Sequence, residues 1–363
     1  MTQRTLALLP GDGIGPEITE ATRVVLAAAS EAFGLGLAFK TIDIGFAALE
    51  ASGSTFPDAA FEAIRACDGI VLGPVSHNTY PARDKGGLNP SGELRKRLDL
   101  FANIRPARTR ANIAPRAGVP LDMVIVRENT EGFYADRNMH SGPGEVMVTE
   151  DVSIAFRRIT RHASMRIARE AFALAETRGK HVTAVHKANV MRVSDGLFLE
   201  CCRSVAADHP DVSYDERIVD AMCAHLVRSP DQYDVIVTTN MFGDILSDLA
   251  SELAGSLGLA ASLNAGETSA MAQAQHGSAP DIAGQDIANP SSLIGSAAML
   301  LTWMGQREND AALLKAADAI DAALEAALTS PDLRTRDLGG STGTQAFAAA
   351  VAAGLSQVSL AGA

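Results

Sequence analysis

Strand-like and helix-like segments alternate along most of this chain, and the alternation restricts the fold more than any other feature. Short apolar runs that indicate strands occur at residues 5–9, 37–44, 68–72, 123–126, 181–185 and 235–239. Segments with helical periodicity occur at residues 16–33, 57–66, 154–178, 290–303 and 310–328. This alternation is typical of an α/β fold with a largely parallel sheet. Two stretches rich in glycine, proline and polar residues, 78–92 and 137–145, are expected to be loops.

Composition and charge narrow the class of protein. The 363 residues are 47% hydrophobic and 20% charged, as in a soluble globular protein of one large or two ordinary domains. The net charge of −12 argues against nucleic-acid binding, which normally needs a basic face. No apolar run approaches the length of a membrane span, and the segment before the first glycines is too short for a signal peptide. The four cysteines show no metal-ligand spacing and are too few for a disulfide framework, so we expect a cytoplasmic protein.

A glycine-rich turn, LLPGDGIGPEI, follows the first expected strand. Gly11, Gly13 and Gly15 are each two residues apart. The dinucleotide-binding fingerprint of Rossmann folds instead places its third glycine three residues after the second, with an acidic residue about 20 residues later. Pro16 suits the first turn of a helix. We therefore predict a structural turn here rather than a phosphate-binding loop.

The stretch TTNMFGDILSDL, residues 238–249, places two aspartates on one helical face. Asp244 and Asp248 are four residues apart, so their like charges lie one above the other. Two such carboxylates can bind a hard divalent cation, Mg²⁺ or Mn²⁺, if a third ligand completes the set. Asp220 is a candidate because it lies in an otherwise apolar run. A solvated helical face explains the pair equally well from these residues alone.

Several other residues have a chemical and an ordinary explanation. Lys187 follows an expected strand and could act as a base beside a metal, although most such lysines simply reach the surface. Tyr134 lies among polar residues and could be a packing residue or an acid. The segment 276–290, HGSAPDIAGQDIANP, could bind an anion or a planar ring, or be an ordinary ordered loop. The arginines at 95–97 and 105–110 are either solvated surface or recognise a small anionic substrate.

These segments occur together, in this order, in one family. The motifs that carry the resemblance are LLPGDGIGPEI, LRKRLDLFANIRPAR, VRENTEGFYA, VHKANVMR, VDAMCAHLV, NMFGDILSDLASELAGSLGL, HGSAPDIAGQDIANP and RDLGGSTGTQAF. The chain resembles the metal-dependent decarboxylating dehydrogenases of 3-substituted malates, the isocitrate/isopropylmalate dehydrogenase family, over nearly its whole length. The resemblance implies a two-domain α/β fold that is not a classical Rossmann fold. It implies a cofactor-side domain of residues 1–100 and 253–363, and a second domain of residues 101–252 with a dimerisation arm near 138–157.

The resemblance also implies a homodimer with shared active sites, and it assigns roles by position. The matching positions are Tyr134 and Lys187 (catalytic), Asp220, Asp244 and Asp248 (metal), and Arg95, Arg105 and Arg127 (substrate carboxylates). Asp220 would reach the metal from across the dimer. Lys187 of the partner subunit would remove the hydroxyl proton, and Tyr134 would protonate the enol carbon after CO₂ leaves.

The coenzyme positions favour NAD. The matching residues are Asn189, His276, Gly277, Ser278, Ala279, Asp281, Ile282 and Asn289. Asp281 followed by Ile282 matches the NAD-dependent members of the family, because a carboxylate can accept hydrogen bonds from the ribose hydroxyls and repels the 2′-phosphate of NADP. The implied cofactors are therefore NAD and Mg²⁺ or Mn²⁺.

The implied reaction is the oxidative decarboxylation of a 3-substituted (R)-malate, a small anionic hydroxy acid. Isopropylmalate dehydrogenases carry leucines where this chain has Ser91 and Gly92, so a branched apolar substituent would lose a contact worth roughly 1.5–3 kcal/mol. Asn89 and Ser91 instead favour a small or polar substituent, of the isocitrate, homoisocitrate, tartrate or D-malate type. The coenzyme loop and the long helix before it read most like isopropylmalate dehydrogenase, which stays the alternative. Gln273 departs from the family, where many members have a glutamate.

Two functions of other classes remain to be weighed. Some members of the family have become non-catalytic regulatory subunits, and such a subunit would be expected to lose the tyrosine, the lysine or a metal aspartate. This chain keeps Tyr134, Lys187 and all three aspartates. A simple metal-binding module would explain the aspartates, but it would explain neither the coenzyme loop nor the arginines. We therefore expect an active enzyme.

Overall fold

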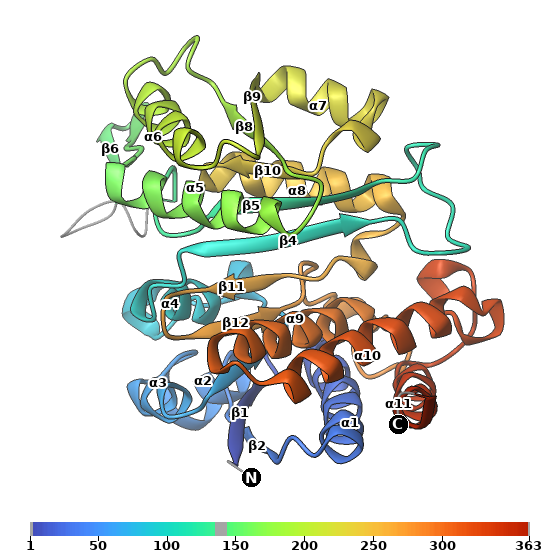
Figure 1. Ribbon diagram of the computed structural model, residues 1–363. Helices are drawn as coiled ribbons and strands as arrows, with labels where there is room; N and C mark the ends of the chain where they lie inside the picture. Colours follow the sequence, from blue (N-terminus) through green and yellow to red (C-terminus); the bar gives the residue numbers. More distant parts are fainter. Residues whose placement is uncertain (1–2, 135–143, 362–363) are drawn as a thin grey trace. The chain divides into compact units, whose positions relative to one another are not determined.

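The computed structural model describes residues 3–134 and 144–361, with side chains up to residue 355. The chain divides into two compact units (Figure 1). The first consists of Met1–Leu98, Arg110–Ile113 and Ser256–Ala363, and the second of Asp99–Thr109 and Ala114–Gly255. No helix in the described part of the chain is long and apolar enough to cross a membrane.

The first unit contains five strands in the order β2-β1-β3-β12-β11. All neighbouring strands are parallel except β11 and β12. The strands are β1 (Arg4–Leu9), β2 (Leu37–Thr41), β3 (Gly69–Leu72), β11 (Leu263–Ala265) and β12 (Ala270–Gln273). The helices are α1 (Gly15–Phe33), α2 (Phe46–Ser52), α3 (Asp58–Arg65), α4 (Pro90–Arg97), α9 (Ser291–Glu308), α10 (Ala311–Thr329) and α11 (Thr344–Ala361).

One apolar core joins this sheet to its long helices. Leu6 and Leu8 of β1 point to the same face because strand side chains alternate. They pack in one cluster with Ile18 of α1, Leu300 of α9 and Phe347 of α11. Many of the buried residues of α9, α10 and α11 are alanines, whose small side chains allow the helices to pack closely. Close packing fills this core without large rings, in keeping with the low aromatic content of 5%.

The glycine-rich turn between β1 and α1 is structural, as its spacing predicts. Gly11 and Gly13 have φ values of 71° and 59°, in the left-handed region that favours glycine. A Cβ atom at Gly11 would collide with the carbonyl oxygen of Pro74, and one at Gly13 with that of Ser278. The glycines therefore allow backbone segments to pack against each other, and Pro16 lies in the first turn of α1 as expected.

The second unit contains five strands in the order β4-β5-β10-β8-β9. β4 is antiparallel to β5, and the other neighbours are parallel. The strands are β4 (Ala102–Arg108), β5 (Asp122–Glu128), β8 (His181–His186), β9 (Ser213–Ile218) and β10 (Val235–Thr238), with a separate antiparallel ribbon of β6 (Glu145–Thr149) and β7 (Val152–Ala155). The helices are α5 (Arg161–Glu176), α6 (Ser194–Asp208), α7 (Val219–Arg228) and α8 (Asn240–Ala254).

Helices cover both faces of this second sheet. Val124 and Val126 of β5 face α5 and α6, whereas Met123 and Ile125 face α7 and α8. A strand buried on both faces reads as a continuous apolar run, which is why β5 is visible in the sequence. Both units are thus α/β, and the predicted fold class is confirmed.

The parallel strands of the second unit end at one edge of the sheet. Thr238, at the end of β10, is paired with Arg127 on β5 and with Val185 on β8. The segments that follow these strands carry Tyr134, Lys187 and the start of α8. In α/β sheets this edge is where ligands bind.

The element boundaries differ from expectation at two places. The helix expected at 154–178 begins at Arg161, because the Thr160 hydroxyl caps its first turn and residues 152–155 form strand β7. The loop expected at 78–92 contains two short 3₁₀ turns and the start of α4. The expected loop 137–145 and the first residues of the expected arm lie outside the described residues, apart from Gly144 and the start of β6.

Candidate active site

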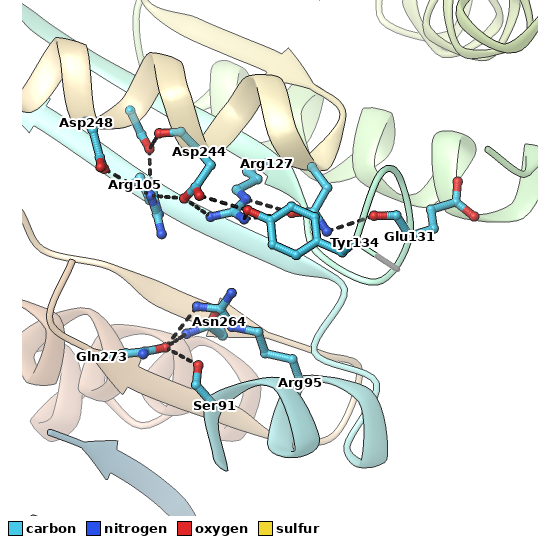
Figure 2. Close-up of polar contacts among 12 residues, drawn as sticks. Ser91, Arg95, Arg105, Arg127, Glu131, Tyr134, Asp244, Asp248, Asn264 and Gln273 are labelled. Carbon is cyan, nitrogen blue, oxygen red and sulfur yellow. Dashed lines mark hydrogen bonds and ion pairs between the residues drawn. The ribbon is translucent and has the colours of Figure 1, made fainter. Parts of the chain in front are cut away.

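Arg127 is the centre of the polar cluster at the edge of the second sheet (Figure 2). Its guanidinium, 2% exposed, donates to Asn240 Oδ1 at 2.7 and 2.9 Å and to the Tyr134 hydroxyl oxygen at 2.7 Å. It also forms an ion pair with Asp244. The Tyr134 hydroxyl in turn donates to Asp244 Oδ2 at 2.8 Å. A buried cation is tolerated only where partners surround it, and these three residues supply them.

Arg105 lies beside Arg127, on the neighbouring strand β4. It donates to Ser247 Oγ at 2.7 Å, and its Nη1 lies 3.1 Å from Asp244 Oδ1 and 3.4 Å from Asp248 Oδ1. Burial, and secondly the positive charge of Arg127, lowers the pKa of Arg105 to about 10. The two arginines and the two carboxylates beside them give the cluster binding groups for both an anion and a cation.

The two aspartates of α8 lie on one face, as their spacing predicts. Their side chains are 41% (Asp244) and 53% (Asp248) exposed, so both carboxylates remain accessible. The buried Arg105 forms ion pairs with both carboxylates, so this helical face is paired with a cation as well as exposed to solvent.

Asp220 and Lys187 form a separate pair in the same unit. Lys187 follows β8, and its Nζ donates to a carboxylate oxygen of Asp220 on α7. This hydrogen bond is the main cause of the lowered pKa of Asp220, whose side chain is 68% exposed. Asn189, two residues after Lys187, lies exposed in the turn that follows β8.

The expected metal ligands are therefore only partly assembled within one chain. Asp244 and Asp248 are oxygen donors of the kind that Mg²⁺ and Mn²⁺ prefer. Among the residues that the structure describes, however, no group of three acidic, histidine or cysteine side chains could hold a metal ion. The two α8 carboxylates fit such an ion, and a complete set needs a ligand from elsewhere.

On the first unit, Gln273 at the end of β12 organises the expected substrate residues (Figure 2). Its Oε1 accepts hydrogen bonds from Ser91 Oγ and Arg95 Nη2, both at 3.0 Å, and from Asn264 Nδ2 at 3.3 Å. Because a guanidinium can only donate, the Gln273 atom that faces it must be the oxygen. Ser91 must then donate its proton to Gln273, so toward a ligand its hydroxyl can only accept.

Asn89, expected from the resemblance to contact the substrate, also has a structural role. It is the N-cap of α4, where its side-chain oxygen accepts a hydrogen bond from the Gly92 backbone N–H at 3.2 Å. Such a cap typically contributes about 1 kcal/mol to helix stability. Its amide N–H groups and the second lone pair of its oxygen remain for a substrate.

The expected coenzyme loop is anchored to the glycine turn of the first unit. The Ser278 carbonyl accepts from the Ile14 backbone N–H at 2.8 Å, and the hydroxyls of Ser278 and Ser76 are 2.7 Å apart. Asp12 accepts from the Ser76 and Phe46 backbone N–H groups, both at 2.8 Å. The loop then turns through Ala279, with φ 36°, into the short 3₁₀ helix Pro280–Ile282, on which Asp281 is exposed.

The remaining loop residues differ in what they can offer a ligand. His276 is partly buried, its Nδ1–H donates to the Gly277 carbonyl at 3.0 Å, and burial lowers its pKa. Its Nε2 is buried without a hydrogen-bond partner among the described residues, so it suits a donor on a bound molecule. Asn289 is engaged at both ends of its amide, with Asp337 and the Ser291 backbone N–H, each at 3.0 Å.

Sequence reasoning did not identify Asn240, Ser247 and Asp12 as site residues. Each acts on a residue far away in the chain, and no local spacing marks it. The sequence marked Gln273 only as a glutamine where many family members have a glutamate. That difference did not reveal that Ser91, Arg95 and Asn264 would donate to it.

The chain matches a family of decarboxylating dehydrogenases along nearly its whole length. The chain belongs to the isocitrate/isopropylmalate dehydrogenase family, whose family model matches residues 5–351. It is 44% identical to the isocitrate/homoisocitrate dehydrogenase of Thermus thermophilus, over 95% of this chain and 97% of the relative. It is 42% identical to the 3-isopropylmalate dehydrogenase of Archaeoglobus fulgidus, over 96% and 98%. The crystal structure of isocitrate dehydrogenase from Methylococcus capsulatus superposes with a TM-score of 0.85 at 39% identity, covering 98% of this chain and 100% of that one.

Gly243 on α8 offers a test of the Arg127 cluster. A Cβ atom there would lie 2.6 Å from Arg127 Cγ and 2.7 Å from Arg127 Cβ, so Gly243→Ala must displace the arginine. We expect kcat/KM to fall about 100-fold, because a displacement of about 1 Å in a site costs that much. Gly196→Ala on α6, where a Cβ meets nothing within 4 Å, is the matched control. Equal activity of the two variants in a steady-state assay would show that the Arg127 position is unimportant.

Glu131, three residues before Tyr134, offers a test of how burial changes the pKa of a carboxyl group near the site. Its carboxylate, 4% exposed, accepts from the Thr160 backbone N–H at 2.7 Å, and burial raises its pKa from 4.5 to about 7. The protonated form is favoured on folding, so stability is lost as the pH rises through 7. Relative to Glu131→Gln, the wild-type free energy of unfolding should fall by up to about 3 kcal/mol between pH 5 and 8.

Urea titrations at both pH values measure this difference. Glu252→Gln, at an exposed position, is the control and should keep the wild-type pH dependence. Parallel pH dependence of wild type and Glu131→Gln would mean that Glu131 is charged in the folded protein at pH 7.

Proposed function

We propose that this enzyme catalyses the NAD- and Mg²⁺- or Mn²⁺-dependent oxidative decarboxylation of a 3-substituted (R)-malate to a 2-oxo acid and CO₂, and that the 3-substituent is small or polar. The observation that carries the proposal is the cluster at the edge of the second sheet. There, two packed arginines adjoin a phenol and two accessible carboxylates, which together suit an anionic hydroxy acid and a divalent cation.

Arg105 and Arg127 would bind the substrate carboxylates. Their planar guanidinium groups suit bidentate contacts, and their burial keeps them rigid. Arg95 of the first unit is assigned the same task from the resemblance alone. The charge of these arginines would restrict the site to dianionic or more highly charged acids.

Asp244 and Asp248 would hold the divalent cation, with Asp220 of a second copy as the third ligand. A bound cation would polarise the 2-oxo group and stabilise the negative charge left when CO₂ departs. The loop of residues 276–289 would hold NAD⁺, which would accept the hydride from C2 of the substrate. On this loop the exposed Asp281 carboxylate favours NAD over NADP.

Lys187 and Tyr134 would move the two protons. Lys187 would remove the hydroxyl proton as the hydride leaves, which requires that Asp220 be drawn away from it. Tyr134 would then protonate the enol carbon. Arg127 Nη2 lies 2.7 Å from the Tyr134 oxygen, so it would stabilise the phenolate formed in that step.

The substituent is inferred from Ser91 and Gln273. Both are polar, Ser91 is buried and donates to Gln273, and a branched apolar group beside them could not hydrogen-bond the Ser91 oxygen or the Gln273 amide N–H groups. A polar substituent avoids this loss. The isopropylmalate alternative keeps its support from the similarity to an isopropylmalate dehydrogenase at 42% identity.

The proposed assembly is a homodimer. The ribbon of β6 and β7 carries exposed apolar side chains, and further ones lie near Lys187 and on α7 and α8. These residues are Val146, Met147, Val148, Val152, Ile154, Val190, Val193, Val227 and Ile245. The five on the paired strands β6 and β7 lie on one small ribbon, and exposed apolar side chains grouped in this way favour a protein partner. A second copy would also supply Asp220 and Lys187.

A substrate panel tests the reaction and the substituent together. NADH formation should be measured with Mn²⁺ and isocitrate, homoisocitrate, isopropylmalate, D-malate or tartrate, with EDTA as the control. We expect turnover of a polar substrate that EDTA abolishes. Preference for isopropylmalate would refute the substituent inference. Turnover undiminished by EDTA would refute the metal dependence, and no turnover of any substrate would favour a regulatory subunit.

Tyr134→Phe tests the proton donor. The substitution removes the hydroxyl that contacts Arg127 and Asp244. The first turnover of NADH should be less impaired than complete turnover, because hydride transfer precedes protonation of the enol. A stopped-flow burst of NADH followed by slow steady-state release of the 2-oxo acid is the expected result. Equal loss in both phases would contradict the assigned role.

A further inference from the structure

The chemical residues of the second unit form two groups. One contains Tyr134 with Arg127 and the α8 carboxylates, and the other contains Lys187 with Asp220. In the proposed reaction these two groups act on different protons. Because Lys187 and Asp220 would act in the site of a second copy, the two groups of one chain would serve the two sites of the dimer, and both sites depend on how this unit holds them.

Arg157 lies between β7 and α5 and connects the surroundings of both groups. Its side chain is buried and donates from Nη1 to Asp195 Oδ1 at 2.5 Å and to Ser194 Oγ at 2.8 Å. From Nη2 it donates to Thr239 Oγ1 at 3.1 Å. One guanidinium thus joins the start of α6 to the start of α8.

Asp195 carries the connection to Lys187. It is fully buried, and its second oxygen, Oδ2, accepts from the Lys187 backbone N–H at 2.6 Å. The Arg157–Asp195 pair therefore fixes the backbone from which the Lys187 side chain extends.

Thr239 and two phenylalanines carry the connection to the Tyr134 group. Thr239 is the N-cap residue of α8, yet its side chain makes no cap hydrogen bond and accepts from Arg157 instead. The Arg157 guanidinium also lies 5.3 Å from the ring centre of Phe133, next to Tyr134, and 5.7 Å from that of Phe242 on α8. Contacts at this range are favourable cation–π interactions.

A buried ion pair is weak evidence for stability, because desolvation of both charges offsets their attraction. This pair differs from a generic one in that both oxygens of Asp195 and both terminal nitrogens of Arg157 have specific partners. Asp195 contacts the backbone of Lys187, Thr239 begins α8, and Phe133 adjoins Tyr134. These contacts indicate that the ion pair positions the proposed catalytic residues more than it stabilises the fold.

We infer that Arg157 and Asp195 are positioning residues that hold both Lys187 and the Tyr134–α8 group of one chain in place, so that the Tyr134 step in its own site and the Lys187 step in the partner's site depend on this one buried pair. The inference rests on the proposed function of Lys187 and Tyr134. It adds two residues that have no direct chemical role, and it links two steps that would otherwise be independent.

Arg157→Met tests the inference, because methionine removes the charge and keeps an unbranched side chain. Two rates should be measured per active site: the first-turnover formation of NADH, and the formation of the 2-oxo acid by chemical quench. Both should fall at least about tenfold, because both proton-transfer groups shift. The dissociation constant of NADH, measured by fluorescence, should change less than either rate, since only Asn189 of the expected coenzyme residues lies near the shifted segment and the loop of residues 276–289 lies on the other unit. Arg157→Lys, which keeps the charge but loses the fork, should recover part of both rates.

Arg178→Met is the matched control. Arg178 also bridges two carboxylates of the second unit, Asp122 at 2.7 Å and Asp234 at 2.9 Å, but at the amino ends of β5 and β10, opposite the site. We expect it to keep both rates. If Arg157→Met fails to fold, the double variant R157M/D195N removes both buried charges and is measured instead.

The outcomes separate the inference from the proposed function. A wild-type protein without turnover on the substrate panel would refute the proposed function. An active wild type, with either rate of Arg157→Met or of the double variant within about twofold of wild type, would overturn only the inference. Loss of both rates in Arg178→Met as well would also overturn it, because the effect would then be general destabilisation.

Discussion

The buried guanidinium of Arg127 is the constraint on which the second unit depends. A cation that is 2% exposed needs polar partners around it, and Asn240, Tyr134 and Asp244 all contact the Arg127 guanidinium. The arginine also needs the missing side chain of Gly243 in order to lie against α8. The register between β5 and α8 is thereby fixed, and with it the place of both aspartates.

This arrangement keeps the cations inside and the carboxylates outside. Arg105 and Arg127 are held rigidly, while Asp244 and Asp248 remain partly exposed. Rigid donors lose little entropy when a substrate binds, and accessible carboxylates can still take a cation. On the first unit, Gln273 organises Arg95 and Ser91 with a neutral oxygen, so the charge of Arg95 is not neutralised by this partner.

Much of the fold could be predicted from the sequence, because buried parallel strands read as short apolar runs and long amphipathic helices show their period. Several elements were not predicted, among them helices α6, α7 and α11 and strand β9, as well as strand β4 and helix α4. β4 contains three polar or charged residues and a proline in ANIRPAR, and α4 carries four charges within PSGELRKR, so neither shows the apolar pattern of a buried element. The expected helix at 154–178 was too long, because the apolar Ile154 belongs to the exposed ribbon and not to α5.

The sequence by itself determined the α/β class, the structural nature of the glycine turn, the shared face of Asp244 and Asp248, and the family. Each of these follows from spacing within a few residues or from motifs in a fixed order. Only the tertiary structure decided that Arg105 lies between those aspartates, that Asn89 caps a helix, and that Arg157 meets Asp195 and Thr239. The partners of Arg105 and Arg157 are 38 to 143 residues away in the chain. The Asn89 cap is local, but it depends on where α4 begins. Which donors and acceptors meet depends on how strands and helices pack, and no local pattern records it.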